Sequence, residues 1–322
     1  MIISCSRRTD IPAFYTHWLM NRLRAGYCTV VNPFNRNSVT RVPLDRKNVD
    51  IIVFWTKNPR SLIEHVEEIN EFEIPYYFQF TVNGYGPVLE PSVPEVEAVI
   101  DTFEKLSRQI GPERVVWRYD PILLDREHTR AYHEDRFDFL AGRLQGHTKQ
   151  VIVSIVDLYQ KTIRNIQKHV PGYECEATPP EPELKLLLSR LSSIAKRRGL
   201  SIQSCAEDKD FTSAGVPPGK CIDDVLIHQL FGVRLSIGKD QGQRPACLCS
   251  ASKDIGFYNT CQHFCRYCYA TTSESTARTS FESHNPDSPS IIGWYEPTET
   301  AKVDSQQTLL FSTPPISGTR RK

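Results

Sequence analysis

Three cysteines lie close together late in the chain, where Cys261, Cys265 and Cys268 form a Cys-x3-Cys-x2-Cys run. Most cysteine metal sites have four protein ligands, because a metal whose coordination is complete is chemically inert. Three thiolates would hold three irons of a 4Fe–4S cluster and leave the fourth iron open to a ligand that is not protein. The run therefore favours a cluster that takes part in chemistry.

Two other metal sites fit the same cysteines. Zinc accepts any four thiolate or imidazole ligands, so Cys247, Cys249 or His263 would complete a zinc site with the run. With Cys247 or Cys249 as the fourth ligand, the run would instead hold a closed cluster that only transfers electrons. The spacing weighs against both, because zinc sites usually separate cysteine pairs by longer loops and bacterial ferredoxins use x2/x2 spacing followed by proline.

A second group of cysteines precedes the run and consists of Cys205, Cys221, Cys247 and Cys249. Free cysteine is often simply a buried core residue. The alternative is a second metal site, either an auxiliary iron–sulfur cluster or zinc. Seven of the ten cysteines crowd into one fifth of the chain, which is typical of metal binding in a reducing compartment.

The composition predicts a cytoplasmic protein with a sizeable core. The 322 residues are 39% hydrophobic and carry a formal net charge of +1. No run approaches the apolar length of a membrane span, and residues 1–5 resemble a strand rather than a signal peptide. We therefore expect no membrane partner, and the near-neutral charge argues against nonspecific binding to nucleic acid.

Short apolar or β-branched runs alternate with segments of helical periodicity, which is typical of a parallel sheet. The predicted strands are Ile2–Cys5, Cys28–Val31, Ile51–Trp55, Tyr76–Phe80, Val115–Tyr119, Val151–Ile155 and Leu200–Ser204, with Gly232–Ile237 as a weaker eighth. Seven or eight such units predict an α/β protein with a (β/α) TIM-like barrel, complete or incomplete. A doubly wound open sheet is the alternative, because closure is not visible in a sequence.

The barrel is expected to occupy residues 1–240. The cysteine-rich segment 241–270 would then fold over the barrel mouth. Residues 271–322 would form a C-terminal tail, and its stretches 271–290 and 312–322, rich in Ser, Thr and Pro, are expected to be disordered or loosely attached.

Charged residues follow the predicted strands, at the ends where a barrel carries its active site. Arg7 and Arg8 follow the first strand, Lys57 the third, and Arg118 and Asp120 the fifth. Helix capping explains many polar residues at such positions, but cations are unfavourable near helix N-termini. Four cations on one rim predict an anionic or polar small-molecule substrate, a carboxylate-bearing cofactor, or ion pairs with acidic neighbours.

The cysteine run, with Tyr267 before its last cysteine, resembles the signature of the radical S-adenosylmethionine (SAM) enzymes. More widely, the segments Ser4–Pro12, Phe54–Pro59 and Asp254–Ala270 look like an uncharacterised bacterial and archaeal family over about residues 1–270. That family is described as a domain of unknown function whose C-terminal cysteine cluster is similar to that of radical SAM proteins. The spore photoproduct lyase group is a more distant analogy.

The resemblance implies a 4Fe–4S cluster at the run, with SAM bound to its open iron. Tyr267 would approach the adenine of SAM, and Arg7 or Arg8 would bind its carboxylate. Two features depart from radical SAM enzymes: the motif follows the predicted barrel rather than opening it, and no Gly-Gly-Glu-like segment is present for the methionyl amino group.

By the same resemblance the protein is an enzyme of unknown substrate that receives electrons from a donor such as flavodoxin or ferredoxin. Lys57, Arg118 and Asp120 would then act on the substrate. The alternative function is a zinc- or Fe–S-stabilised binding protein without radical chemistry. Nucleic acid is one candidate ligand, which the interleaved aromatic and basic residues of Trp117–Tyr119 and His263–Tyr267 permit and the near-neutral charge disfavours.

Overall fold

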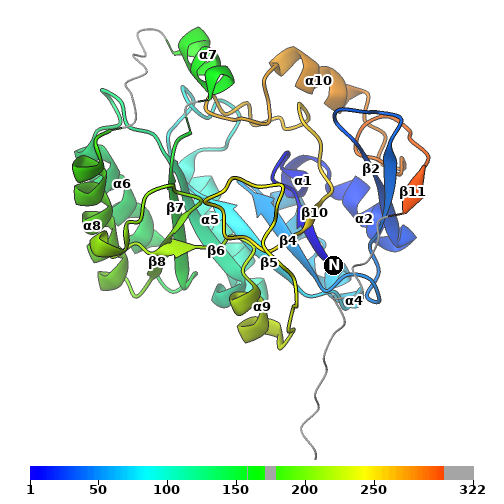
Figure 1. Ribbon diagram of the computed structural model, residues 1–322, viewed down its shortest axis with the longest axis horizontal. Helices are drawn as coiled ribbons and strands as arrows, with labels where there is room; N and C mark the ends of the chain where they lie inside the picture. The colour runs from blue at the N-terminus through cyan, green and yellow to red at the C-terminus, as the bar shows by residue number, and fades with distance from the viewer. Residues whose placement is uncertain (158, 171–178, 301–322) are drawn as a thin grey trace, which may run out of the picture.

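The computed structural model describes residues 1–157, 159–170 and 179–300 (Figure 1). Its larger sheet contains β1 (Ile2–Cys5), β4 (Ile51–Thr56), β5 (Tyr76–Thr81), β6 (Val115–Ile122), β7 (Gln150–Ile155), β8 (Ser201–Cys205), β9 (Pro218–Gly219) and β10 (Lys253–Asp254). The strand order is β10-β1-β4-β5-β6-β7-β8-β9, and neighbouring strands are parallel. A smaller sheet has the order β11-β3-β2, from β2 (Tyr27–Val31), β3 (Val39–Pro43) and β11 (Glu299–Thr300).

The helices connect these strands. They are α1 (Ile11–Phe14), α2 (Thr16–Ala25), α3 (Arg60–Ile63), α4 (Val66–Glu71), α5 (Val96–Ile110), α6 (Arg130–Arg143), α7 (Gln160–His169), α8 (Glu181–Arg197), α9 (Asp224–Phe231) and α10 (Glu274–Glu282), with short 3-10 turns at Pro112–Arg114 and Thr212–Ala214. Asp10 caps α1 by accepting a hydrogen bond from the Ala13 backbone nitrogen at 3.0 Å. Gly26 ends α2 with a φ of 71°, a conformation that glycine adopts without strain.

Alternate residues of the central strands pack into two apolar layers, one on each face of the larger sheet. On one face, residues such as Phe54 and Trp117 pack against the helices that connect successive strands. On the other face, Val53 and Val116 pack against the chain between residues 221 and 249, which includes α9. The helices that connect successive strands gather on one face because each crossover adds the next strand on the same side, and such crossovers are typically right-handed.

The prediction of a barrel is wrong, because the sheet is open. Closure requires hydrogen bonds between the first and last strands. Within the described ranges no strand pairing joins the edge strands β9 and β10. After β9 the chain instead forms α9 and crosses one face of the sheet to pair Lys253 and Asp254 with β1 (Figure 1). The α/β class holds, but the architecture is an open parallel sheet.

Two strand predictions also differ from the structure. The run at Cys28–Val31 does form a strand, but it lies in the smaller sheet and pairs antiparallel with β3, which the sequence analysis missed. Gly232–Ile237 forms no strand. It belongs to the crossing segment, the chain between residues 221 and 249 that covers one face of the sheet. Both errors arise because an apolar run predicts a strand without predicting its partner.

The chain beyond the cysteines packs beside the smaller sheet. The Trp18 indole nitrogen donates to the Ser288 carbonyl at 2.9 Å, and the Thr29 nitrogen donates to the Pro289 carbonyl at 2.8 Å. β11 then pairs with β3. Residues 271–290, expected to be disordered or loosely attached, are instead ordered, because they contain α10 and buried residues such as Ser288. The expectation for 312–322 lies outside the described residues, and the division of the chain at residues 240 and 270 stays a prediction.

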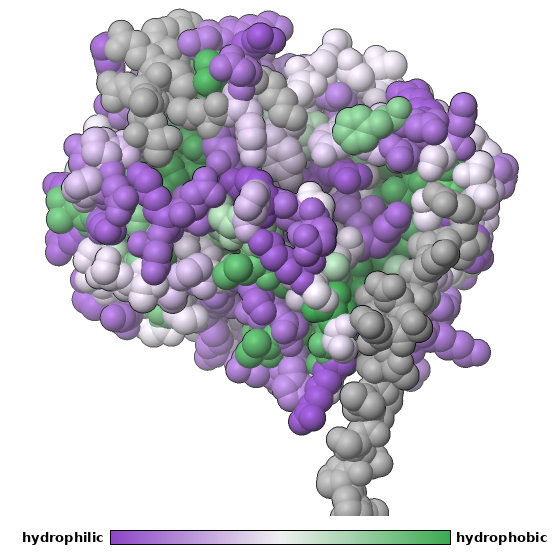
Figure 2. Space-filling view, in the orientation of Figure 1, coloured by the Kyte–Doolittle hydropathy of each residue, from purple (hydrophilic) through white to green (hydrophobic). Residues whose placement is uncertain are grey.

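The face of the molecule in Figure 2 is mostly hydrophilic, and its apolar residues form small separate patches. None of the helices in the described ranges has the length and apolar character needed to cross a bilayer.

Candidate functional site

A cavity of about 300 Å³ lies at the carboxyl ends of the parallel strands. Every residue that the sequence analysis assigned to a site lines it: Arg7, Arg8, Lys57, Arg118, Asp120, Tyr267, Cys205, Cys221, Cys247, Cys249, Cys261, Cys265 and Cys268. The structure therefore brings the charged rim and both cysteine groups into one place. Their chemical roles stay predictions.

The period of a β-strand explains why polar side chains reach this cavity. Side chains on one face repeat every second residue, so β4 carries Val53 and then Trp55, and β6 carries Val116 and then Arg118. The first member of each pair is covered by the crossing segment. The second member lies nearer the carboxyl end of its strand and lines the cavity.

Asp254 of β10 holds the loop that follows β1. Its carboxylate accepts hydrogen bonds from the hydroxyls of Ser4 and Ser6, at 2.9 and 2.7 Å, and from the Arg7 nitrogen at 2.8 Å. It also accepts from the Gly256 nitrogen at 3.0 Å. The short edge strand β10 thus positions the loop after β1, which carries the rim residue Arg7.

Lys57 belongs to a buried network with Glu90 and Tyr267. Its ammonium lies 2.7 Å from the Glu90 carboxylate and 3.0 Å from the Tyr267 hydroxyl, and that hydroxyl also donates to Glu90. Burial alone would raise the pKa of Glu90, but the charge of Lys57 and the hydrogen bonds from both partners hold it below its usual value. Lys57 therefore fixes Tyr267 of the cysteine run rather than standing free for an anion.

Arg118 is also paired. It forms an ion pair with Asp120, whose carboxylate also accepts a hydrogen bond from Ser154. Burial alone would raise the pKa of Asp120, and the Arg118 charge with these hydrogen bonds holds it below its usual value. The register of β6 against β7 is irregular between Tyr119 and Ile122, where Asp120 lies, and such irregularities often direct side chains at functional sites.

Arg7 is less completely satisfied than Lys57 and Arg118. Its guanidinium lies 5.2 Å from the centre of the Trp55 ring, and its Nη1 lies 3.5 Å from the Asp240 carboxylate. Its Nη2 is buried and has no hydrogen-bond partner. Arg8 stacks over Tyr258 at 5.0 Å. Arg7 thus keeps a buried donor that is available to a ligand.

The cysteine run is tied to the strand ends by several hydrogen bonds. His263 lies 2.8 Å from the Asp10 carboxylate, and the Arg266 nitrogen donates to the Leu89 carbonyl at 2.9 Å. The Tyr269 hydroxyl donates to the Arg7 carbonyl at 2.8 Å. These bonds hold the run at the rim of the cavity.

The sulfurs of the cysteine run lie in buried surroundings that contain backbone N–H donors. Burial raises the pKa of Cys261 to about 12, and backbone N–H groups of Asp10 and His263 donate to its sulfur. The Ala270 nitrogen donates to the Cys268 sulfur at 3.3 Å. Such N–H donors are typical of cluster thiolates, whose negative charge they stabilise.

Among the residues with described positions, no group of three or more His, Cys, Asp or Glu side chains is arranged to hold a single metal ion. A cluster makes a different demand, because each thiolate binds a different iron and the sulfurs need not meet at one point. All three cysteines of the run line one cavity and two of their sulfurs accept N–H donors, which are features that an iron–sulfur cluster requires.

The segments predicted to contact nucleic acid lie inside the protein. Trp117, Arg118 and Tyr119 are buried in β6. His263 and Tyr267 are buried against the strand ends. This fold therefore does not offer their aromatic rings to stacked bases.

The sequence analysis missed Glu90 and Asp254. Glu90 lies in the long loop between β5 and α5, and Asp254 lies in a two-residue strand. Neither position carries a local signal, because each matters only through partners far away in the chain. The one available clue was that the buried cations of the rim require acidic partners.

Glu207, after β8, predicts a measurable dependence of stability on pH. Burial, together with the nearby Asp157 carboxylate, raises the pKa of Glu207 to about 7. The folded state therefore keeps a proton that the unfolded state loses, and stability falls as pH rises from about 4.3 to about 7. Glu207→Gln should raise the free energy of unfolding by about 1–3 kcal/mol near pH 8 and change it little near pH 5.

Urea unfolding at the two pH values tests this prediction. The Ile155 nitrogen donates to Glu207 at 2.8 Å, and a glutamine oxygen accepts the same bond. The control is Asp208→Asn at the exposed neighbouring residue. If Glu207→Gln raised the free energy of unfolding equally at both pH values, the raised pKa of Glu207 would be contradicted.

Comparison with known proteins identifies a family. A family described as "Domain of unknown function (DUF1848)" matches residues 2–270. This range includes both cysteine groups and every rim residue discussed above. Among curated proteins, none matches the sequence.

Proposed function

We propose that this chain, which belongs to the DUF1848 family, is a radical SAM-type enzyme that acts on a small polar or anionic substrate. The observation that carries the proposal is the position of the cysteine run. Cys261, Cys265 and Cys268 line the same cavity as Lys57 and Asp120. A cluster bound there would adjoin the space that a substrate would occupy.

When bound and reduced, such a cluster supplies the electron that splits SAM and so starts radical chemistry on the substrate. The chain itself would bind, orient and exclude water. Tyr267 supports this role because Lys57 and Glu90 hold its hydroxyl and so fix its ring at the cavity, where we propose that it contacts the adenine.

The remaining rim residues divide between cofactor and substrate. Arg7 has an unpartnered buried nitrogen, so we assign it to a carboxylate, that of SAM. Asp120 lines the cavity, and its ion pair with Arg118 favours the charged form of its carboxylate. Asp120 would therefore accept a hydrogen bond from a substrate hydroxyl or amine. Arg8 remains a weaker candidate for cofactor binding, because it stacks on Tyr258.

The experiment is to incubate anaerobically reconstituted protein with dithionite and SAM and to measure 5′-deoxyadenosine by mass spectrometry. The wild-type chain should produce it. Cys265→Ser should bind less iron and produce none, whereas Cys28→Ser, which changes a buried cysteine in β2, should behave like the wild type. The proposal fails if a reducible wild-type cluster yields no 5′-deoxyadenosine and SAM leaves its EPR spectrum unchanged.

A further inference from the structure

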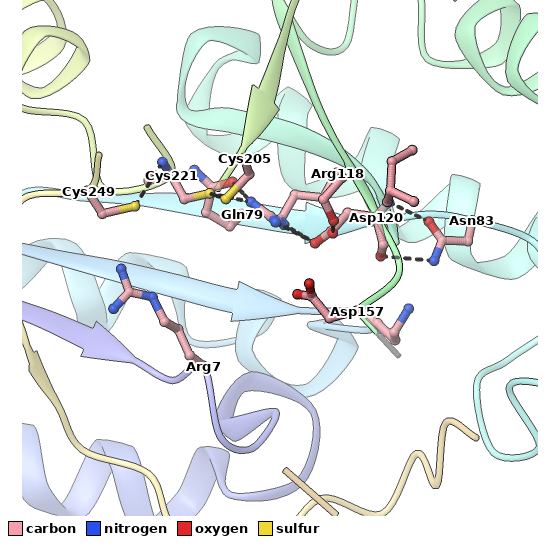
Figure 3. A network of polar contacts seen from close by, with 12 residues as sticks. Arg7, Gln79, Asn83, Arg118, Asp120, Asp157, Cys205, Cys221 and Cys249 are labelled. Carbon is pink, nitrogen blue, oxygen red and sulfur yellow. Dashed lines mark hydrogen bonds and ion pairs between the residues drawn. The ribbon is translucent and has the colours of Figure 1, made fainter. Parts of the chain in front are cut away.

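We propose that Cys205 and Cys221 form a redox-active dithiol in the wall of the cavity, which a small-molecule disulfide oxidises reversibly to an internal disulfide. The proposal requires neither a metal nor radical chemistry at the other cysteines. It rests on how the two thiols lie relative to each other and to Arg118 (Figure 3).

The two sulfurs lie 2.8 Å apart, although the residues are 16 positions apart in the chain, and neither residue is in a disulfide. Forming a bond of about 2.05 Å requires the sulfurs to approach by less than about 1 Å, which small side-chain rotations supply. Both residues line the cavity, and Cys205 is the less buried of the two. The pair is therefore close enough to be oxidised, and Cys205 is the thiol that a reagent meets first.

Strand pairing and a close backbone approach bring the two thiols together. Cys205 ends β8 in register with Gly219 of β9, and Cys221 follows two residues later. A Cβ atom at position 219 would lie only 2.1 Å from the Gln203 side chain of β8, so glycine permits this approach. The same side chain donates to the Lys220 carbonyl at 2.9 Å. These contacts hold the chain before Cys221 against the end of β8.

Strand β5 fixes Cys221 from the other side. The Cys221 carbonyl accepts hydrogen bonds from the Tyr77 hydroxyl at 2.6 Å and from the Gln79 side chain at 2.7 Å. Both of these donors are buried. A thiol held in this way reacts with its neighbour at a high effective concentration, because the entropy of bringing the two together is lost when the protein folds.

Arg118 supplies the positive charge that favours a thiolate. Its Nη1 donates to the Cys221 sulfur at 2.8 Å, while its Nε donates to Asp120 at 2.9 Å. The hydrogen bond from Cys221 and the charge of Arg118 lower the pKa of Cys205, although burial opposes this shift. Thiolates beside arginine are the nucleophiles of thiol–disulfide exchange. Cys205 is therefore the attacking thiol and Cys221 the resolving thiol.

The reaction balances with the small disulfide as the only oxidant. The Cys205 thiolate attacks one sulfur of the reagent, forms a mixed disulfide and releases one reagent thiolate. The Cys221 sulfur then attacks the Cys205 sulfur and releases the other. The two released thiolates take up the protons that the two cysteines give up. Two electrons thus pass from the pair to the reagent, which leaves as two thiols.

Oxidation changes the charge around the cavity. The reduced pair carries the negative charge of one thiolate, and the disulfide carries none, so Arg118 loses an anionic neighbour. Arg118 also holds Asp120, which lines the same cavity. The redox state of the pair therefore acts on the binding space whatever reaction takes place there.

Anaerobic incubation of the full-length protein with hydroxyethyl disulfide tests the proposal. The remaining thiols are blocked with N-ethylmaleimide before digestion with trypsin and mass spectrometry. Trypsin separates positions 205, 221 and 249, for which the expected peptides are 199–209, 221–234 and 240–253. We expect the first two peptides to be linked, and excess mercaptoethanol should reverse the link. Protein unfolded in urea controls for chance pairing and should give a mixture of links.

Two variants separate the steps of the reaction. Cys221→Ser lacks the resolving thiol, so it should accumulate at least about tenfold more mixed disulfide at Cys205 than the wild type. Cys28→Ser, which changes a buried cysteine in β2, should behave like the wild type.

The link in the folded wild type decides the proposal even where a variant folds poorly. The proposal is overturned if the wild type forms no link between positions 205 and 221, if Cys221 links to Cys249 instead, or if the wild type stops at the mixed disulfide. The assay uses neither iron nor SAM, so its failure is distinguishable from failure of the proposed function.

Discussion

Lys57→Met should lower the free energy of unfolding by about 3–5 kcal/mol, the usual cost of leaving a buried charge without its partner. The Lys57 ammonium lies 2.7 Å from the Glu90 carboxylate, whose side chain is only 4% exposed. Methionine keeps much of the length and apolar volume of lysine, so the variant removes the charge with little change in packing. It also removes one of the hydrogen bonds to the Tyr267 hydroxyl, so the variant weakens a contact that positions the cysteine run.

The direction of the pH dependence follows from the pKa of Glu90. In the wild type this pKa is lower than in the unfolded chain, so the pair stabilises the protein above the unfolded pKa and loses this effect as pH falls. In Lys57→Met the pKa of Glu90 should rise. The deficit should therefore be largest near pH 8 and shrink toward pH 5, where the carboxyl takes up a proton.

Urea unfolding of a double-mutant cycle measures the interaction. Adding Glu90→Gln to Lys57→Met removes the unpaired charge and should recover at least about 2 kcal/mol at neutral pH. The exposed pair between Lys105 and Glu64 is the matched control, and Lys105→Met should cost under about 1 kcal/mol. Similar costs for the two lysines would show that the Lys57 pair is as well solvated as a surface pair.

Gly256→Ala should destabilise the protein by about 1–3 kcal/mol, the usual range for overpacking. A Cβ atom at this position would lie 2.0 Å from the Ser6 hydroxyl and 2.6 Å from the Ser6 Cβ. Neither atom can move freely, because Ser6 donates to Asp254 and the same carboxylate binds the Gly256 nitrogen. The substitution should therefore displace the segment that leads to the cysteine run and lower its metal content.

Gly238→Ala provides the control. A Cβ atom there would meet no heavy atom within 4 Å, so its effect should stay within about 0.5 kcal/mol. Urea unfolding and iron content are measured for both variants. If the two alanines behave alike, close contact between residues 6 and 256 does not govern the position of the run.

Local pattern was enough to predict the parallel strands and the residues at their ends. A run such as Ile51–Trp55 is apolar on both faces, and Lys57 follows it at the active edge. The pattern did not predict closure, because an edge strand and a barrel strand have the same local sequence. The segment between residues 221 and 249 covers one face of the open sheet, and its covering residues include Ile227 of α9 and Val233 of the run predicted as an eighth strand.

The cysteines were predictable as a set because thiolate spacing is itself chemical information. The carboxylate partners of the rim cations were not predictable in the same way. The sequence left open whether Lys57 and Arg118 hold an external anion or pair with acidic neighbours, and in the structure both have internal carboxylate partners. Such pairing depends on loops such as that of Glu90, whose neighbours are set only by the complete fold.

The pairing of β10 with β1 has a consequence for the order of folding. Strands β1 to β8 of the larger sheet lie side by side in chain order, so each can join as it leaves the ribosome. The contact between Ile3 and Lys253 closes a loop of about 250 residues, and contacts so distant in the chain form late. Synthesis of the chain would thus present a nearly finished sheet with an exposed edge before the thiols of the run arrive. Insertion of the cluster proposed above would then be among the last events in maturation.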